Sequence, residues 1–254
     1  MNYRILIFIL LVACSKSELN KDIKLIAHAG TGIYNPQRYF SENSLEAIEY
    51  ALSFSEVDGV ELDVQFSKDG TAWLFHDETL NDRTNGNGVL CEKSDVYLNE
   101  ISYNGLIKEE LTPFYEIDFS NYQDKIFMWD LKLWESCSTS SQVIENFANQ
   151  IASLNVVENH IVILNNPTYI NIFQLLNIKC FFDGNNSENI NAMITNNPHY
   201  SGVVVAEDVL NKEEINYFRN SKGIEIVVFG VRSPFGVKRG GDCKGFCVFE
   251  KFKS

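Results

Sequence analysis

The sequence predicts an α/β fold, a TIM-type (β/α)8 barrel, from two features of its pattern. Eight short apolar runs alternate along the chain with stretches of helical periodicity. The runs are mostly apolar, which is typical of parallel strands covered by helices on both sides. A chain of 254 residues that is 45% hydrophobic has the length and the apolar content for one such barrel.

The elements follow one another in strand-helix order. The expected strands are 24–30, 59–66, 71–77, 125–134, 160–164, 178–182, 202–206 and 224–230. The expected helices are 43–54, 140–153, 168–176, 187–195 and 211–220. In the first helix, Asn43 is the expected N-cap and Glu46 completes a pattern like a capping box. Its apolar positions Leu45, Ile48 and Leu52 share one face.

The N-terminus predicts processing rather than a fold element. Arg4 precedes the apolar run 5–12, which is much shorter than the ~20 residues needed to cross a bilayer. The sequence Leu-Val-Ala-Cys that ends at Cys14 resembles a bacterial lipobox, in which the cysteine is acylated. We therefore expect a lipoprotein signal peptide over 1–13, a tether over 14–22 and the barrel over 23–254. This arrangement predicts a lipid-anchored protein of the bacterial cell envelope; the alternative is a plain secretory peptide.

Charge and cysteine usage narrow the possible partners. A net charge of -13 repels nucleic-acid backbones, so no nucleic-acid partner is expected. The five cysteines after Cys14 are odd in number and irregular in spacing, and we expect no essential disulfide among them. Cys180 lies in an apolar run and is expected to be a buried thiol.

Ionisable side chains stand near the carboxyl ends of four expected strands. Because side chains alternate along a strand, Glu61 and Asp63 share a face, as do Asp130 and Lys132. His28 and His76 fall at the ends of two others, the first and the third. TIM barrels assemble their active sites at this end. A solvent-exposed face of an edge strand is the alternative, but it accounts for only one of the four strands.

We expect different roles for the three acids and for His160. Glu61, Asp63 and Asp130, without a cysteine cluster, suit a hard divalent cation, Mg²⁺ or Ca²⁺. His160 begins its strand at the end opposite the predicted site, and we expect a structural role for it.

Five segments resemble successive motifs of the glycerophosphodiester phosphodiesterase family, which belongs to the phospholipase-C-like phosphodiesterase barrels. They are IAHAG (26–30), SENSLEAI (41–48), GVELDVQFSKDG (59–70), LFHDETLNDRTNGNG (74–88) and MWDLK (128–132). The order and spacing agree over about half of the chain.

The resemblance implies roles for the matching residues. Glu61, Asp63 and Asp130 would bind a divalent cation, with Asp130 replacing the longer glutamate that is usual in the family. His28 and His76 would act as general base and general acid. Lys132 would lie near the phosphate.

The sequence departs from the family at two places. Ala29 follows the first histidine, where the family usually has an arginine that contacts phosphate. Arg38, or Lys132 together with the metal, is a candidate replacement, and Glu42 is a candidate to support the site or to interact with the start of the helix. The second departure is the C-terminal segment 239–254, which predicts an atypical or incomplete closure of the barrel; 246–252 is the remaining candidate strand.

These observations predict a metal-dependent phosphodiesterase that uses two histidines to hydrolyse glycerophosphodiester-like substrates, with a phospholipid headgroup or another polyol. Imidazoles exchange protons near neutral pH, and a cation neutralises the anionic diester. Two alternatives stay open: a lipoprotein that binds metal or headgroup with little or no turnover, and a barrel glycoside hydrolase with two catalytic carboxylates. The glycoside hydrolase would not need His28 and His76.

Overall fold

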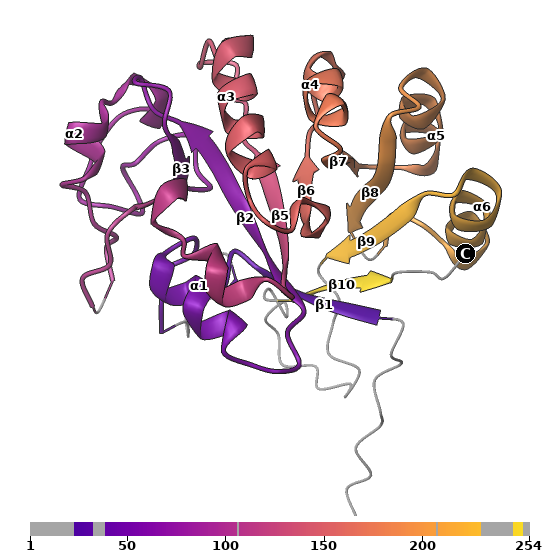
Figure 1. Ribbon diagram of the computed structural model, residues 1–254, viewed down its shortest axis with the longest axis horizontal. Coiled ribbons are helices and arrows are strands. Elements are labelled where there is room, and N and C mark those ends of the chain that lie inside the picture. The colour runs from indigo at the N-terminus through magenta and orange to yellow at the C-terminus, as the bar shows by residue number, and fades with distance from the viewer. Residues whose placement is uncertain (1–22, 33–38, 106, 207, 230–245, 251–254) are drawn as a thin grey trace, which may run out of the picture.

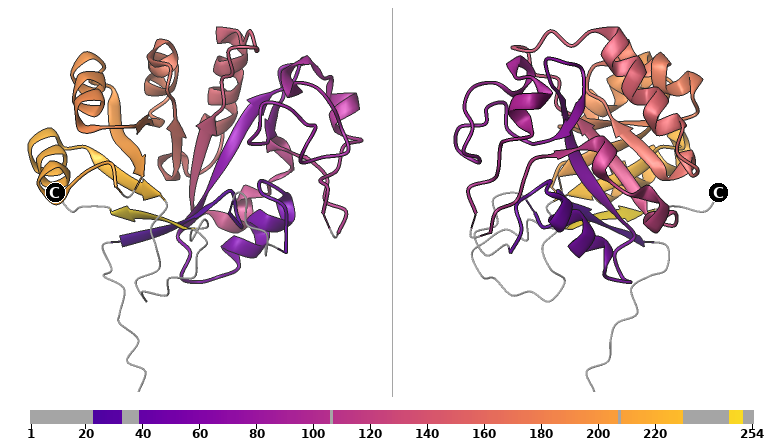
Figure 2. Two further views of the ribbon diagram at one scale, coloured as in Figure 1. Left: turned by 180° about the vertical axis from the view of Figure 1, so that it is seen from behind. Right: turned by 60° about the vertical axis from the view of Figure 1, so that its left-hand side comes forward.

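A computed structural model describes residues 23–32, 39–105, 107–206, 208–229 and 246–250. Its centre is a barrel of strands, and Figures 1 and 2 show helices standing around the outside. The parallel barrel strands, each paired with the next, are β1 (Ile23–His28), β2 (Gly59–Phe66), β5 (Ile126–Leu131), β6 (His160–Ile163), β7 (Lys179–Gly184), β8 (Tyr200–Ala206) and β9 (Glu225–Phe229). The predicted fold class is therefore confirmed.

The last barrel strand, β10 (Phe246–Glu250), runs against the others. It pairs antiparallel with both β1 and β9, so the eighth place in the barrel is taken by an antiparallel strand. This is the atypical closure that the C-terminal sequence predicted, and it uses the segment that the sequence left as the remaining candidate.

The helices cover the outer face of the barrel. They are α1 (Leu45–Leu52), α3 (Ser141–Ala152), α4 (Ile170–Leu175), α5 (Ser187–Asn196) and α6 (Lys212–Lys222). In α3 the Ser140 side chain caps the N-terminus, and the residues buried against the strands are spaced three and four apart: Ile144, Phe147, Ala148 and Ile151. In α6, Asn211 and Glu214 form a capping box and Gly223 ends the helix with φ 67°, as helix C-termini favour.

The strands bury both faces, which separates the core into two layers. The inward layer, inside the barrel, consists of Ile26, Met128, Ile161, Ile163, Phe181, Val204 and Val227. The alternate residues, such as Leu62 and Trp129, pack outward against the helices. Polar side chains that share the inward face therefore come together above the inner layer, at the carboxyl ends of the strands.

A long excursion follows β2 and carries its own small core. It contains β3 (Ala72–Leu74), α2 (Asp95–Leu98) and β4 (Thr112–Pro113). It also contains the short 3-10 helices η1 (Leu90–Glu92), η2 (Phe114–Glu116) and η3 (Phe119–Tyr122). Two further 3-10 helices lie outside it: η4 (Val157–Asn159) directly precedes β6, and η5 (Pro167–Tyr169) directly precedes α4. Because β3 pairs antiparallel with β2, the expectation that 71–77 is a barrel strand is wrong; the apolar run forms a hairpin instead.

The start of α1 also differs from the prediction. Ser44 is the N-cap, and its side chain accepts a hydrogen bond from the Ala47 N–H. Asn43 precedes the cap with φ 61°, a left-handed conformation that asparagine tolerates better than most residues. Its side chain is thereby released from capping and can serve the site described below.

Cys91 and Cys137 form a disulfide, which contradicts the expectation that no disulfide is needed. The two residues are 46 positions apart and come together because the excursion folds back over the loop after β5. The expectation for Cys180 is confirmed: it is a free thiol, and burial raises its pKa to about 12.

Several sequence predictions lie outside the described residues. They are the signal peptide over 1–13, the tether over 14–22, Cys14 and Arg38. Among the residues that the structure does describe, no helix is long and apolar enough to cross a membrane.

Candidate active site

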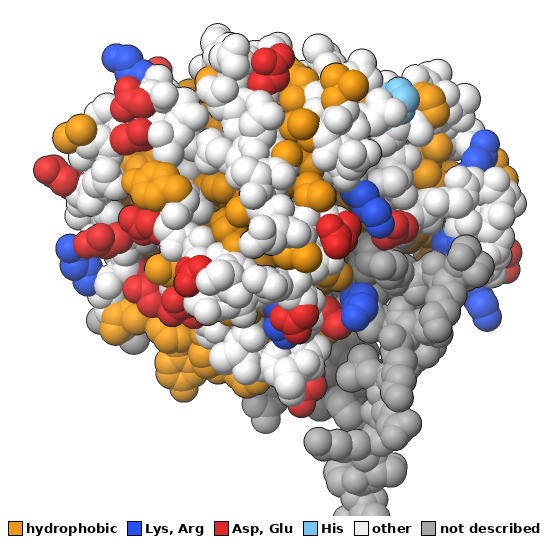
Figure 3. All heavy atoms as spheres, viewed as in Figure 1, with side chains coloured by type: hydrophobic (Ala, Val, Ile, Leu, Met, Phe, Trp, Pro, Cys, Tyr) orange, Lys and Arg blue, Asp and Glu red, His pale blue; other side chains and the backbone are white. Residues whose placement is uncertain are grey.

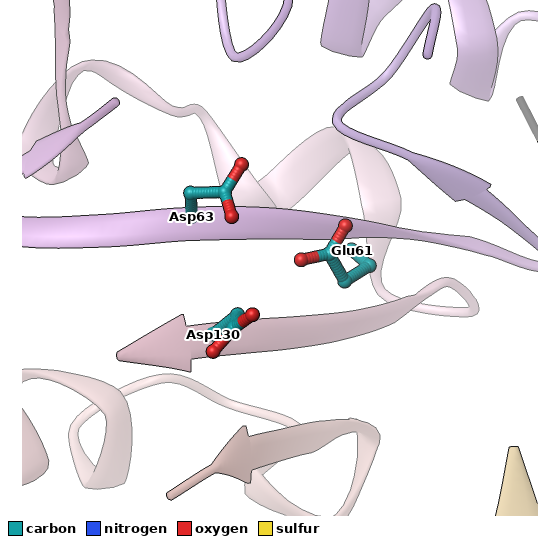
Figure 4. A group of neighbouring side chains, drawn as sticks. All are labelled: Glu61, Asp63 and Asp130. Atoms are coloured by element: carbon teal, nitrogen blue, oxygen red, sulfur yellow. The ribbon is translucent and has the colours of Figure 1, made fainter. Parts of the chain in front are cut away.

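Three carboxylates meet at the carboxyl end of the barrel. Glu61 and Asp63 come from β2 and Asp130 from the neighbouring β5, where Asp63 and Asp130 are in register. Each offers a carboxylate oxygen, and these oxygens lie within 4.8 Å of one another. Figure 4 shows the three side chains gathered on one side of the two strands. The alternation in the sequence thus predicted correctly which acids share a face.

Burial and mutual repulsion dominate the electrostatics of these acids. Burial raises the pKa of Glu61 well above its usual range, and the charges of Asp63 and Asp130 raise it further. Burial also raises the pKa of Asp130, although Lys132 partly opposes it. For Asp63 the nearby cations outweigh burial, with Lys132 first, so the pKa of Asp63 is lowered.

Lys132 lies between two of the carboxylates. Its Nζ is 2.6 Å from Asp130 Oδ2 and 3.1 Å from Asp63 Oδ1. Burial lowers the pKa of Lys132, but the surrounding carboxylates outweigh burial and hold that pKa above its usual range. The ammonium is therefore charged and placed where an anionic group entering the site would meet it.

The carboxylates have the chemistry of a site for a hard divalent cation. All the donors are oxygens, which suit Mg²⁺ or Ca²⁺. Asp63 Oδ1 is buried and accepts no hydrogen bond from the described part of the chain, although it lies near the Lys132 ammonium. Two buried acids and the half-buried Asp130, with one lysine, leave negative charge that a divalent cation would balance.

His28 ends β1 directly beside this cluster. It is in register with Glu61, and its Nε2 lies 3.5 Å from Glu61 Oε2. Burial lowers the pKa of His28, and Asp63 only partly offsets that effect. The imidazole is therefore neutral at neutral pH and able to accept a proton.

His76 arrives by a route that the sequence did not predict. β2 continues past the barrel rim, β3 returns antiparallel to it, and the Phe75 N–H donates to the Asp63 carbonyl at 3.0 Å. His76 follows at once and lies close enough to Asp63 to contribute to the lowering of its pKa. The buried Gln65 amide holds this turn by donating to the Phe75 and Asp77 carbonyls.

A chain of charged side chains orients His76. Its Nδ1 lies 2.7 Å from Asp77 Oδ1, and Arg83 Nε donates to Asp77 Oδ2 at 3.1 Å. Arg83 also lies 3.5 Å from the buried Glu42. Burial raises the pKa of Asp77, but the hydrogen bonds from His76 and Arg83 outweigh it and lower that pKa. Glu42 is thus linked to His76 by a chain of charged contacts that runs through Arg83 and Asp77.

Sequence reasoning missed Asn43 and the buried Glu109 as supports of the site. Asn43 Nδ2 donates to Asp63 Oδ2 at 2.8 Å, and its Oδ1 accepts from the Asp63 N–H at 3.0 Å. Glu109 accepts hydrogen bonds from Ser41 and Ser44, which fixes the segment that carries Asn43. Asn43 lies in a quoted motif and could have been found; no local signal marks Glu109.

Ala29 occupies a left-handed turn just after His28. Its φ is 47°, its side chain is fully buried, and its N–H donates to the Glu61 carbonyl at 2.8 Å. The side chain at this position is therefore a buried methyl group, which offers no donor to a phosphate. The structure describes no arginine beside His28, and Arg38 lies outside the described residues.

The sequence over residues 28–213, more than half of the chain, matches the Glycerophosphoryl diester phosphodiesterase family. The chain belongs to this family. The matched range contains both histidines, the three carboxylates and Lys132. The predicted family resemblance is therefore confirmed.

Individual relatives agree with the assignment. A glycerophosphodiester phosphodiesterase of Caldanaerobacter subterraneus is 31% identical over 146 residues, which are 54% of this chain and 56% of that protein. The chain thus spans only about half of this relative's length. Among solved structures, a glycerophosphodiester phosphodiesterase from Agrobacterium tumefaciens has a TM-score of 0.64 at 20% identity, covering 82% of this chain and 87% of its own.

A second solved structure is a phosphodiesterase of Oleispira antarctica in complex with its product sn-glycerol-3-phosphate. Its TM-score is 0.62 at 18% identity, and the match covers 82% of this chain and 84% of that one. At such low identities, the two matches show that this chain shares the fold of these structures.

Proposed function

We propose that this chain is a metal-dependent phosphodiesterase that hydrolyses glycerophosphodiester-like substrates. The observation that carries the proposal is that two histidines accompany one cluster of three carboxylates. His28 Nε2 lies 3.5 Å from Glu61 Oε2, and His76 directly follows Phe75, whose N–H donates to the Asp63 carbonyl. Family membership supports the reaction class, and the product complex of the Oleispira antarctica relative supports a glycerol phosphate moiety in the substrate.

The two histidines divide the proton transfers. Burial lowers the pKa of His28, so His28 is suited to take a proton from the attacking water as its oxygen bonds to phosphorus. When the bond to the leaving alcohol breaks, His76 supplies the proton for the alkoxide oxygen. The hydrogen bond between its Nδ1 and Asp77 assigns the other ring nitrogen, Nε2, to this transfer.

Glu61, Asp63 and Asp130 would hold the divalent cation. When bound, a cation of this kind neutralises the charge of the diester and favours attack by the nucleophile. Lys132, charged and next to two of these acids, is the protein's own cation for the phosphate. Lys132 contributes more to phosphate binding here because position 29 is an alanine, which has no guanidinium group to donate two hydrogen bonds to phosphate oxygens.

A steady-state assay with bis-p-nitrophenyl phosphate tests the proposal. We expect turnover that disappears on exhaustive chelation and returns when Mg²⁺ or Ca²⁺ is restored. A protein that only binds headgroups or metal would bind them without turnover. A glycoside hydrolase would cleave nitrophenyl glycosides in the presence of the chelator and ignore the diester.

We further propose that Cys14 is acylated and anchors the protein to a membrane of the cell envelope. The disulfide between Cys91 and Cys137 supports this location, because disulfides persist in oxidising compartments and are rare in the cytosol. The test is cell fractionation of the wild type and of Cys14→Ala, with mass spectrometry of the N-terminus. A soluble wild type that retains the residues before Cys14 would disprove the anchor.

A further inference from the structure

Aromatic side chains from the segment before α1, from α1 itself and from the residues after it form a partly exposed stripe. Tyr39 is 82% exposed, Tyr50 43% and Phe54 44%. Three of the rings touch: the centroids of Phe40 and Tyr50 are 5.4 Å apart, and those of Tyr50 and Phe54 are 5.1 Å apart. Tyr39 directly precedes Phe40 in the chain. We call these four residues the aromatic stripe. Figure 3 shows hydrophobic side chains gathered at the lower left, in the region that α1 occupies in Figure 1.

One end of the aromatic stripe adjoins the active site. Tyr39 and Phe40 directly precede Ser41, whose N–H donates a hydrogen bond to Glu109. Two residues further on, the side chain of Asn43 donates a hydrogen bond to Asp63. The stripe is therefore attached, through a few residues of backbone, to the group that positions a site carboxylate.

The other end of the stripe lies near the start of the described chain. Asp58 accepts hydrogen bonds from Lys24 Nζ and the Leu25 N–H, each at 2.8 Å. Phe54 and Asp58 are four positions apart, a span of at most ~14 Å. The stripe thus reaches close to the point at which β1 begins, just after the N-terminal segment.

These positions favour a membrane surface as the occupant of the stripe. Residues 14–22 can extend over at most ~30 Å, so an anchor at Cys14 holds the stripe within reach of the bilayer. Tyrosine and phenylalanine have an apolar body, and tyrosine also has a polar tip, which suits the boundary between headgroups and acyl chains. The exposed Glu49 and Glu56 flank the stripe and disfavour an anionic surface.

We propose that the aromatic stripe docks on a neutral, zwitterionic bilayer and presents the active site to phosphodiesters held in that bilayer. The inference rests on the proposed phosphodiesterase function and narrows its substrate class to glycerophosphodiesters that retain an acyl chain. A lipid anchor alone leaves the orientation of the barrel free. The stripe fixes that orientation by placing Tyr39, close before the buried residues 41–43, against the membrane.

Vesicle flotation of the full chain carrying Cys14→Ser isolates the stripe from the anchor. The fraction of protein that floats with phosphatidylcholine vesicles is compared between this protein and the same protein carrying Tyr39→Ser/Phe54→Ser. We expect roughly tenfold weaker partitioning for the double variant, from the loss of two aromatic contacts. Leu175→Ser is the matched control, since Leu175 is 83% exposed but lies on α4; it should leave partitioning unchanged. Adding phosphatidylglycerol should weaken binding of the wild-type stripe.

Activity gives an independent readout. The double variant should keep its turnover of soluble bis-p-nitrophenyl phosphate within about twofold, because neither residue touches the site, and lose roughly tenfold on a monoacyl glycerophosphodiester in vesicles. Equal partitioning of the wild type and the double variant would overturn the proposal, as would an equal loss in Leu175→Ser. So would a dimer that the double variant converts to a monomer, which would make the stripe a contact between copies. Because flotation needs no turnover, these outcomes are separate from a failure of the proposed function.

Discussion

The side-chain amide of Asn43 forms two hydrogen bonds with Asp63, one with its carboxylate and one with its backbone N–H. Nδ2 donates to Oδ2 at 2.8 Å and Oδ1 accepts from the N–H at 3.0 Å, and both residues are almost fully buried. The amide thereby leaves Asp63 Oδ1 directed at Lys132 and the acidic cluster. Asn43 thus positions a carboxylate that the proposed chemistry depends on.

We expect Asn43→Ala and Asn43→Gly to lower kcat equally, by roughly tenfold or more, because each removes the same two hydrogen bonds. The backbone separates the variants. At φ 61° glycine is unstrained, whereas alanine costs about 1 kcal/mol, so Asn43→Gly should be the more stable by that amount in urea unfolding. If Asn43→Gly keeps full activity, the amide plays no part in catalysis.

His28 and His76 should behave as one unit. Either His→Ala change should lower kcat by roughly 10²-fold or more, and the double variant should fall by less than the product of the two. Unfolding free energies should change little, since both side chains line the site. The pH-rate profile of the wild type should be bell-shaped. A His76→Ala enzyme with near-wild-type turnover of a diester would refute the two-histidine mechanism.

Removal of the metal should act through the carboxylates. Titration calorimetry should detect one site for Mg²⁺ or Ca²⁺ in the wild type and none in Asp63→Asn. The same variant should lose roughly 10³-fold or more in kcat, because a cation that stabilises transition-state charge contributes several kcal/mol. Glu78→Gln, an acid outside the cluster, is the control and should bind metal normally. Unchanged metal binding in Asp63→Asn would place the cation elsewhere.

The disulfide between Cys91 and Cys137 should contribute measurably to stability. Closing a loop of 46 residues is worth about 4 kcal/mol in the chain-entropy treatment. We expect Cys91→Ser/Cys137→Ser to unfold at lower urea concentration than the oxidised wild type, by about that free energy. Reductant should bring the wild type to the level of the variant and leave the variant unchanged. A reductant effect of equal size in the variant would show that another group is responsible.

His160 should make the protein less stable in mild acid. Burial lowers its pKa from 6.5 to about 4, so between these pH values the unfolded chain binds a proton that the folded chain does not. Stability is therefore lost as the pH falls through this window, by about 2 kcal/mol between pH 7 and pH 5. In His160→Asn this component should vanish, leaving a flatter dependence of unfolding free energy on pH even though the variant is less stable at neutral pH.

The parts of the site that depend on strand alternation were predictable from the sequence. Glu61, Asp63, Asp130 and Lys132 occupy alternate positions, and a period of two fixes which face each takes once the strand is recognised. The structural role of His160 was predictable from its position at the start of a buried strand, at the end of the barrel opposite the site. In the structure, Trp129 Nε1 donates a hydrogen bond to His160 Nδ1.

The remaining features depend on contacts between distant segments. The run 71–77 has the composition of a barrel strand, and only its pairing with β2 reveals that it leaves the barrel. Asn43 looks like an N-cap because Ser44, one residue later, has the same capping ability. Cysteine spacing gave no sign that the excursion would bring Cys91 to Cys137. In each case the interaction that decides the structure is a tertiary contact, which produces no periodic pattern in the sequence.

The antiparallel eighth strand has a consequence for the order in which the molecule can fold. β10 fits between β1 and β9, and its contacts with β1 are among the most distant in sequence in the described chain. Such contacts form late, because the entropy of closing a long loop opposes them. Until residues 246–250 leave the ribosome and insert, β1 and β9 present open sheet edges that can recruit other chains. The nascent protein is then in most need of a chaperone, just before its last strand is in place.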